Sequence, residues 1–248
     1  MTLHWLEQIE DDVPSGDDWL STEERRRLYE FRFEKRRADW RLGRWTAKNA
    51  VARFLHLPAI PQTLAEIEVR TPSGAPEIVL QQRVSDVAVS LSHRARTALC
   101  AVGPANMVFG CDLETVETRS EAFISDYFTE SEYSFLARAL SEDRDLYVAL
   151  LWSAKESVLK ALRVGLRVDT RSVSVALDER WAQTHVVEAG NRTNSGEWQS
   201  FRARSSDGQQ FWGWWRAENR MVRTIVSTAR VAAPVQVQDK DQMLCSAC

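Results

Sequence analysis

Two carboxylates in one apolar segment are the first residues of this sequence that could do chemistry. Asp112 and Glu114 lie in residues 109–114 (FGCDLE), where the alternation of a strand puts both carboxylates on the same face. The same alternation gives the opposite face to apolar side chains. Charged groups in apolar surroundings are costly unless they are paired or bound to a metal. This segment therefore predicts a strand that presents a pair of metal-binding or ion-paired carboxylates.

A second charged group lies about forty residues later, in residues 151–160 (LWSAKESVLK). The pattern predicts a helix, in which Glu156 and Lys160 are neighbours one turn apart and Lys155 lies beside them. Three carboxylates and two ammonium groups that converge would suit a hard divalent cation together with phosphate oxygens.

Each segment also has an ordinary structural interpretation. An acidic pair two residues apart is common on the solvent face of an antiparallel sheet, and a Glu–Lys pair one turn apart is commonly a solvated helix pair. The apolar residues around both groups favour the functional interpretation.

A basic stretch in residues 21–55 is the next signal. It opens on Ser21, a plausible helix cap, and between Arg25 and Lys48 it has ten basic residues against three acidic ones. Guanidinium groups suit phosphates because their fork geometry permits two parallel hydrogen bonds. A solvated basic face and a nucleic-acid patch are the alternatives.

His93 follows an apolar strand pattern over residues 87–93, with Ser92 directly before it. An imidazole at the end of a strand could bind a phosphate or a ring, although a single histidine is more often structural.

Composition limits the classes of protein that remain. The chain has 248 residues and a net charge of -3, which indicates no general affinity for nucleic acid or acidic lipid. It shows no signal peptide and no apolar run near the roughly 20 residues needed to span a bilayer. Cys100 and Cys111 fall in strand patterns and are expected to be buried thiols, which favours a reducing cytoplasm. Cys245 and Cys248 form a terminal C-x-x-C that is a weak zinc candidate.

The order of predicted elements favours an α+β fold with mainly antiparallel sheets. Helices are expected at 21–55, 119–127, 130–140 and 143–163. Strands are expected at 67–70, 87–93, 98–102, 109–114, 172–177, 185–188, 199–204, 210–216 and 222–227.

Together these motifs resemble the 4′-phosphopantetheinyl transferases of the two-half, surfactin-synthetase-activator type. The family pattern is G-[IV]-D-x-E, a gap of about forty residues, and W-[ST]-x-K-E-[SA]-x-x-K. Residues 110–114 (GCDLE) and 152–160 (WSAKESVLK) match it. The resemblance covers roughly residues 20–180, and the stretch 35–44 is closest to siderophore-type and mycobacterial-type members.

The resemblance implies transfer of the phosphopantetheine arm of coenzyme A to a serine of an apo carrier protein, with release of adenosine 3′,5′-bisphosphate. It implies that Asp112, Glu114 and Glu156 hold Mg²⁺, with Mn²⁺ as a possible substitute. Glu114 would be either a direct ligand or the holder of a bound water. Glu156, or a water it orients, would take the serine proton, and Lys160 would offset charge on the phosphates.

The resemblance also implies a set of residues that grip coenzyme A: Arg36, Arg44, Ser92, His93, Lys155 and Lys160. Two departures stand out. Cys111 replaces the usual Ile or Val, and residues 73–76 (SGAP) lack the lysine that many members carry in this loop. One phosphate contact must therefore be missing or come from elsewhere.

The expected architecture is a monomer of two pseudo-symmetric halves, each with helices packed on a small sheet, and with the active site in the cleft between them. The halves are expected at 1–106 and 107–230, followed by a tail at 231–248. Acyl or peptidyl carrier domains of peptide synthetases, polyketide synthases, siderophore pathways or fatty-acid synthases would dock near residues 119–140. The alternatives are a non-catalytic coenzyme A or nucleotide-binding module and a nucleic-acid-binding protein that uses the arginine-rich helix.

Overall fold

The chain was analysed as a computed structural model that describes residues 2–72, 74–177 and 196–238. It forms two compact units, Met1–Met107 with Pro234–Cys248, and Val108–Ala233. Below, they are called the first unit and the second unit.

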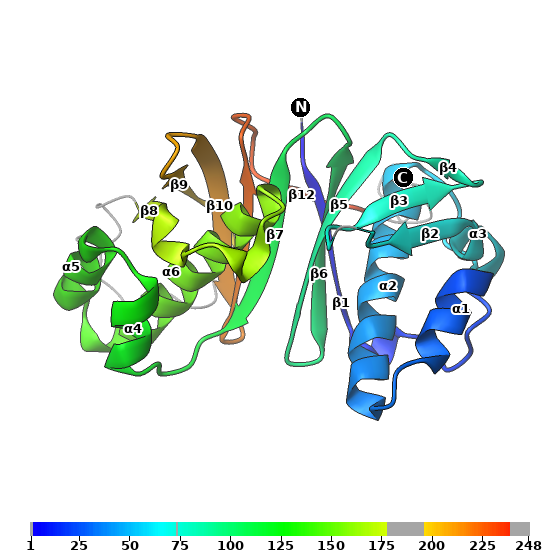
Figure 1. The fold of residues 1–248 in the computed structure, drawn as a ribbon, viewed down its shortest axis with the longest axis horizontal. Helices are drawn as coiled ribbons and strands as arrows, with labels where there is room; N and C mark the ends of the chain where they lie inside the picture. Colours follow the sequence, from blue (N-terminus) through cyan, green and yellow to red (C-terminus); the bar gives the residue numbers. More distant parts are fainter. Residues whose placement is uncertain (1, 73, 178–195, 239–248) are drawn as a thin grey trace, which may run out of the picture. The chain divides into compact units, whose positions relative to one another are not determined.

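The first unit packs one long helix on a four-stranded sheet of order β12-β1-β6-β5 (Figure 1). The strands are β1 (His4–Ile9), β5 (Val87–Arg94), β6 (Thr97–Pro104) and β12 (Val235–Gln236). The helices are α1 (Thr22–Tyr29), α2 (Glu34–Phe54) and α3 (Pro61–Glu66). A second sheet contains β2 (Ile67–Arg70), β3 (Glu77–Leu80) and β4 (Arg83–Val84). Helix α2 packs against β1, β5 and β6, and its small apolar residues Ala47, Ala50 and Val51 are fully buried there.

The expected single helix over 21–55 is two helices, which corrects that prediction. Helix α1 begins at a capping box formed by Ser21 and Glu24, and the chain leaves helical geometry before Phe33, which is extended. The break has a packing reason: Phe31 is buried and stacks near Trp40, with ring centroids 5.8 Å apart. The N–H of the Arg37 side chain also donates to the Phe31 carbonyl at 2.8 Å. A continuous helix would lose this carbonyl contact.

The second unit has a five-stranded antiparallel sheet of order β7-β11-β10-β9-β8. Its strands are β7 (Phe109–Thr115), β8 (Val173–Leu177), β9 (Gln199–Ser205), β10 (Gln210–Glu218) and β11 (Met221–Ser227). Its α-helices are α4 (Glu121–Tyr127), α5 (Glu130–Arg138) and α6 (Ser141–Ala161). Helix α6 packs across β7 and β11 and buries most of its length in the core of this unit (Figure 1).

The α+β class is confirmed, and so are the helices of the second unit. The predicted strand 185–188 lies outside the described residues. Strands β1, β3, β4 and β12 were not expected from the sequence. Within the segment expected to be a tail, Val235 and Gln236 pair in parallel with β1. Cys100 and Cys111 are buried free thiols, as expected. No helix among the described residues is long and apolar enough to cross a membrane.

Candidate active site

The charged cluster of the second unit depends on a close approach between strand β7 and helix α6. Gly110 makes this approach possible, because a Cβ there would lie 2.1 Å from the Ser157 carbonyl oxygen and 2.7 Å from the Ala161 nitrogen. No side chain fits at such distances without a backbone shift. The glycine of the first motif therefore allows the helix of the second motif to lie directly on its strand.

Three buried hydroxyls fix where α6 sits on the sheet. The hydroxyls of Ser153 and Ser157 lie 2.9 and 2.7 Å from the Thr224 hydroxyl, and Ser157 also donates to the Thr224 carbonyl at 3.2 Å. Thr224 on β11 is the register partner of Asp112 on β7. The sequence analysis missed these hydroxyls. The signal was the four-residue spacing of the two serines, which puts them on one helix face.

Asp112, Glu156 and Lys160 converge, as the spacing of the two motifs predicts. The Lys160 ammonium lies 2.6 Å from an Asp112 carboxylate oxygen and 3.9 Å from a Glu156 oxygen. Asp112 is 2 % exposed, whereas Lys160 keeps 28 % of its side chain accessible. Burial acts to lower the pKa of Lys160, but the charge and hydrogen bond of Asp112, together with Glu156, outweigh burial and raise it.

Glu114 is on the same strand but has different partners. One of its oxygens accepts the indole N–H of Trp152 at 3.1 Å, and the other lies 3.8 Å from the Arg119 guanidinium. Trp152 is itself packed edge-on against Phe123 and Tyr127. Glu114 is thus directed toward Trp152 of α6 and toward Arg119.

The oxygen donors of this cluster suit a hard cation, although they are not preassembled around one. In the described part of the chain, no three acidic, histidine or cysteine side chains are grouped closely enough to hold a metal ion. Asp112 and Glu156 share the ammonium of Lys160, which takes the place that a cation would have between two carboxylates. Asp112 and Glu156 therefore fit Mg²⁺ by chemistry, and Glu114 fits it less directly.

Lys155 does not join this cluster, which corrects the expectation that two ammonium groups converge there. Its side chain is fully buried, and its ammonium lies 2.9 Å from Glu132 and donates to the carbonyls of Thr170 and Val173 at 3.1 and 2.5 Å. Burial lowers the pKa of Lys155, and Glu132 offsets this only in part.

The first unit contains a pocket of about 920 Å³ that gathers basic and aromatic side chains. Its basic lining residues are Arg27, Arg36, Arg44, Arg70 and His93. Acidic residues also line it: Glu23, Glu24, Asp39 and Glu68. Arg36, Arg44 and His93 were expected from the sequence to grip a nucleotide, and the structure brings these three to one pocket.

Aromatic rings support the guanidinium groups of this pocket. The guanidinium carbons of Arg27 and Arg36 lie 5.4 and 5.2 Å from the Phe31 ring centroid, and that of Arg44 lies 4.8 Å from the Trp40 centroid. Such contacts orient a guanidinium and leave its N–H groups available for an anion.

Ser92 is not among the residues that line this pocket, although His93 is. Neighbouring residues of a strand point to opposite faces, so both cannot face the same space from one regular strand. Ser92 is buried and His93 is exposed, in keeping with that alternation. Two pocket residues, Arg27 and Arg70, were not predicted from the sequence. Arg27 belongs to the basic stretch 21–55 that was already singled out, whereas nothing local to Arg70 marked it.

These observations define an α+β protein with an acidic cluster on one strand–helix pair and a separate basic pocket. Residues 108–209 match the 4′-phosphopantetheinyl transferase superfamily. The chain is 28% identical over 163 residues to the 4′-phosphopantetheinyl transferase HetI of Nostoc sp. (strain PCC 7120), a match that covers 65% of this chain and 67% of HetI. It is 31% identical over 94 residues to the 4′-phosphopantetheinyl transferase Sfp of Bacillus subtilis (strain 168), covering 38% of this chain and 41% of Sfp.

Over these segments the chain is similar to the 4′-phosphopantetheinyl transferase superfamily of enzymes. The superfamily match spans both β7 and α6, the two elements that carry the acidic cluster.

Proposed function

We propose that this protein transfers the 4′-phosphopantetheine group of coenzyme A to a serine hydroxyl of an apo carrier protein domain. The observation that carries the proposal is the convergence of Asp112, Glu156 and Lys160 within the segment that matches the superfamily. In the reaction the serine oxygen forms a bond to the pantetheine-bearing phosphorus. The pyrophosphate P–O bond breaks, and adenosine 3′,5′-bisphosphate leaves with the electron pair.

Each member of the acidic cluster has a proposed role. Asp112 and Glu156 would hold Mg²⁺, or Mn²⁺ in its place, and Glu114 would be either a third ligand or the holder of a bound water. When bound, the cation neutralises the pyrophosphate charge. Glu156, or a water it orients, takes the serine proton. Lys160, partly exposed beside both carboxylates, offsets the charge that develops on the phosphates.

The basic pocket of the first unit is the proposed site for the nucleotide part of coenzyme A. Arg36, Arg44 and His93 would bind its phosphates, because guanidinium and imidazole N–H groups donate to phosphate oxygens. Arg70 is a candidate for the cation that residues 73–76 lack, since it lines the same pocket and is about half exposed.

Arg70→Gln is therefore expected to weaken binding of coenzyme A more than binding of its 3′-dephospho form, as measured by calorimetry. Arg26→Gln is the control, because Arg26 is exposed on the neighbouring helix and does not line the pocket. Equal losses of affinity for the two ligands would contradict binding of the 3′-phosphate by Arg70.

The carrier protein is proposed to dock on residues 119–140 of a monomeric enzyme. Exposed Tyr127, Tyr133 and Leu140 give this region apolar contact area. The substrate would be a carrier domain of a peptide synthetase, a polyketide synthase, a siderophore pathway or a fatty-acid synthase, which all present a serine on a similar helical domain.

Substitution of the cluster tests the proposal. Asp112→Ala and Glu156→Ala are expected to abolish transfer to an apo carrier while the protein still melts cooperatively. Glu142→Ala is the control, since Glu142 lies exposed in the first turn of the same helix, α6. Near-normal turnover of either cluster variant would contradict the metal and base assignments. Binding of coenzyme A by the wild-type protein without transfer to any carrier would instead indicate a binding module.

A further inference from the structure

Each unit contains a fully buried lysine at the same place in its long helix. Lys48 lies fourteen residues after Glu34, the first residue of α2, and Lys155 lies fourteen residues after Ser141, the first residue of α6. Both helices have 21 residues, and both lysine side chains have 0% exposure. A buried lysine is rare and requires a partner.

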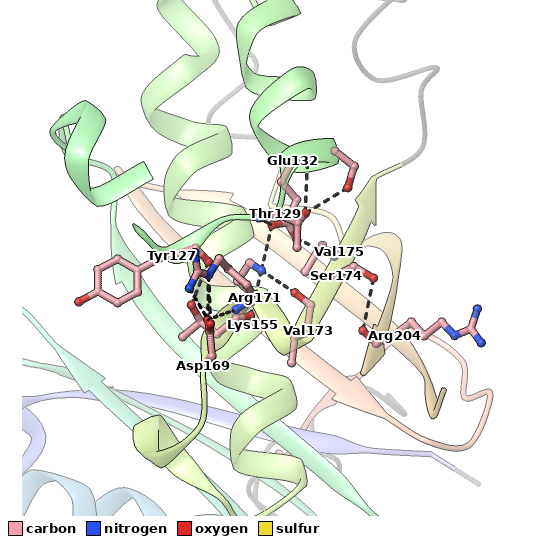
Figure 2. A network of polar contacts seen from close by, with 12 residues as sticks. Tyr127, Thr129, Glu132, Lys155, Asp169, Arg171, Val173, Ser174, Val175 and Arg204 are labelled. Carbon is pink, nitrogen blue, oxygen red and sulfur yellow. Dashed lines mark hydrogen bonds and ion pairs between the residues drawn. The ribbon is translucent and has the colours of Figure 1, made fainter. Parts of the chain in front are cut away.

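In the second unit the partner is the capping glutamate of the preceding helix (Figure 2). Glu132 is the third residue of α5, and one of its oxygens pairs with Lys155 at 2.9 Å and accepts the Thr129 backbone N–H at 2.8 Å. Its other oxygen accepts the N–H of Val175 on β8 at 2.7 Å. Lys155 also donates to two backbone carbonyls, so one ion pair joins α6, α5 and β8.

The first unit repeats this network with different residues. Glu24 is the third residue of α1, and one of its oxygens pairs with Lys48 and accepts the Ser21 backbone N–H at 3.0 Å. Its other oxygen accepts the N–H of Val69 on β2 at 3.0 Å. Lys48 also donates to two backbone carbonyls, those of Trp19 and Leu64, at 3.0 and 2.9 Å.

We infer that these two networks are one positioning device, present in each unit, and that Lys48 and Lys155 are positioning residues for the two proposed substrate-binding groups. We call each network a lysine–cap lock. The inference rests on the proposed function, because the groups that the locks serve are the basic pocket and the acidic cluster.

The lock of the first unit controls the charge of the pocket. Glu24 lines the pocket, and one of its oxygens lies 3.9 Å from the Arg44 guanidinium. A free carboxylate there would hold Arg44 and repel a phosphate. Pairing with Lys48 offsets the charge of Glu24 and leaves Arg44 available to bind an anion. Loss of Lys48 therefore weakens binding of coenzyme A.

The lock of the second unit controls the orientation of α6. Lys155 directly precedes Glu156 and faces away from the cluster, toward α5 and β8. It thus opposes rotation of the helix that would turn Glu156 and Lys160 away from Asp112. Loss of Lys155 lowers turnover more than it lowers affinity for coenzyme A.

Four variants and one control test the inference. Lys48→Met and Lys155→Met keep the length of the side chain but leave a buried carboxylate without its cation. Each substitution is therefore also combined with a change of its partner glutamate, which gives Lys48→Met/Glu24→Gln and Lys155→Met/Glu132→Gln. Glutamine carries no charge and keeps one acceptor oxygen, which can serve either the cap N–H or the strand N–H. Lys35→Met is the control, because Lys35 is exposed on α2 and does not line the pocket.

Steady-state kinetics and thermal melting are measured for each protein. Lys48→Met is expected to raise KM for coenzyme A roughly tenfold with kcat nearly unchanged, and Lys155→Met to lower kcat roughly tenfold with KM nearly unchanged. Each double variant is expected to melt at a higher temperature than its single lysine variant. Lys48→Met/Glu24→Gln is also expected to regain the wild-type KM for coenzyme A.

Either of two results would contradict the inference. If Lys155→Met/Glu132→Gln melts like the wild type but no longer binds coenzyme A, Lys155 is a ligand-binding residue. If both single variants keep wild-type KM and kcat, the locks have no role in the site. Absence of transfer by the wild-type protein would contradict the proposed function itself, and melting of the single and double variants would then decide whether the locks exist.

Discussion

Gly110 shows how much of the acidic cluster depends on a residue that has no side chain. A β-carbon at this position would lie 2.1 Å from the backbone oxygen of Ser157, so β7 and α6 can touch only through glycine. The charged cluster forms next to this contact, because Asp112 lies two residues after Gly110 on β7 and Lys160 lies three residues after Ser157 on α6.

Gly110→Ala is accordingly expected to destabilise the protein by about 3 kcal/mol and to lower turnover, because backbone must move to admit the methyl group. The measurements are chemical denaturation and kcat. Gly43→Ala is the matched control: nothing lies within 4 Å of its Cβ in the middle of α2, and alanine there is expected to stabilise the helix by about 0.5–1 kcal/mol. Equal effects of the two substitutions would contradict the close approach.

Asp169 and Arg171 form a surface pair with a defined pH response. The hydrogen bonds from the side chain and backbone of Arg171 lower the pKa of Asp169 from 3.8 to about 2 (Figure 2). A carboxyl whose folded pKa is lowered stabilises the fold above its unfolded pKa and loses that contribution as pH falls toward the folded value. The melting-temperature difference between wild type and Asp169→Asn should therefore be greatest above about pH 4 and vanish near pH 2. A difference that does not change over this range would contradict the assignment.

The sequence predicted the meeting of Asp112, Glu156 and Lys160, because strand alternation and helix periodicity each place charges on one face. The sequence did not predict that Glu156 joins the cluster while the adjacent Lys155 points away from it, since two neighbouring helix residues differ only in the direction of their side chains. The direction of Lys155 is decided by Glu132, and no periodicity links those two positions.

The contact between α6 and β11 combines a group of buried hydroxyls with apolar side chains. Thr224→Val keeps the shape of the side chain but leaves the buried hydroxyls of Ser153 and Ser157 without this partner. The expected loss is about 2 kcal/mol of unfolding free energy, measured by denaturant titration. Ser200→Ala, on the exposed face of β9, should change it by less than about 0.5 kcal/mol. A neutral Thr224→Val would show that the hydroxyls do not hold the helix.

Most of the long elements were predictable, whereas β1 with six residues and the shorter β3, β4 and β12 were missed. Helix α6 and strands β5 to β7 follow clear apolar patterns, whereas β4 and β12 have two residues each, too few to show a period. The break between α1 and α2 was also missed. Arginine-rich sequence on both sides favours helix, and only the burial of Phe31, a tertiary effect, interrupts it.

For the molecule as a whole, the question is how a chain of net charge -3 binds an anionic substrate. Four arginines and His93 line one pocket of the first unit, together with four acidic residues. Because salt screens exposed charges, KM for coenzyme A is expected to rise severalfold between about 0.05 and about 0.5 M salt, with kcat less affected. An uncharged solute at matched osmolality is the control. A KM that does not change with salt would contradict phosphate binding by this pocket.

Each of the two units contains one lysine–cap lock. The resemblance predicts two pseudo-symmetric halves, and that similarity stays a prediction. No single segment of the sequence revealed the locks, because each joins residues far apart along the chain.

The central claim is tested most directly by the mass of a carrier protein. The wild-type chain is incubated with coenzyme A, Mg²⁺ and each of several apo carrier domains, and every carrier is then weighed intact. At least one carrier is expected to gain the mass of a single phosphopantetheine group on its serine, with adenosine 3′,5′-bisphosphate formed in equal amount. An unchanged mass for all carriers, with coenzyme A left intact, would contradict the central claim.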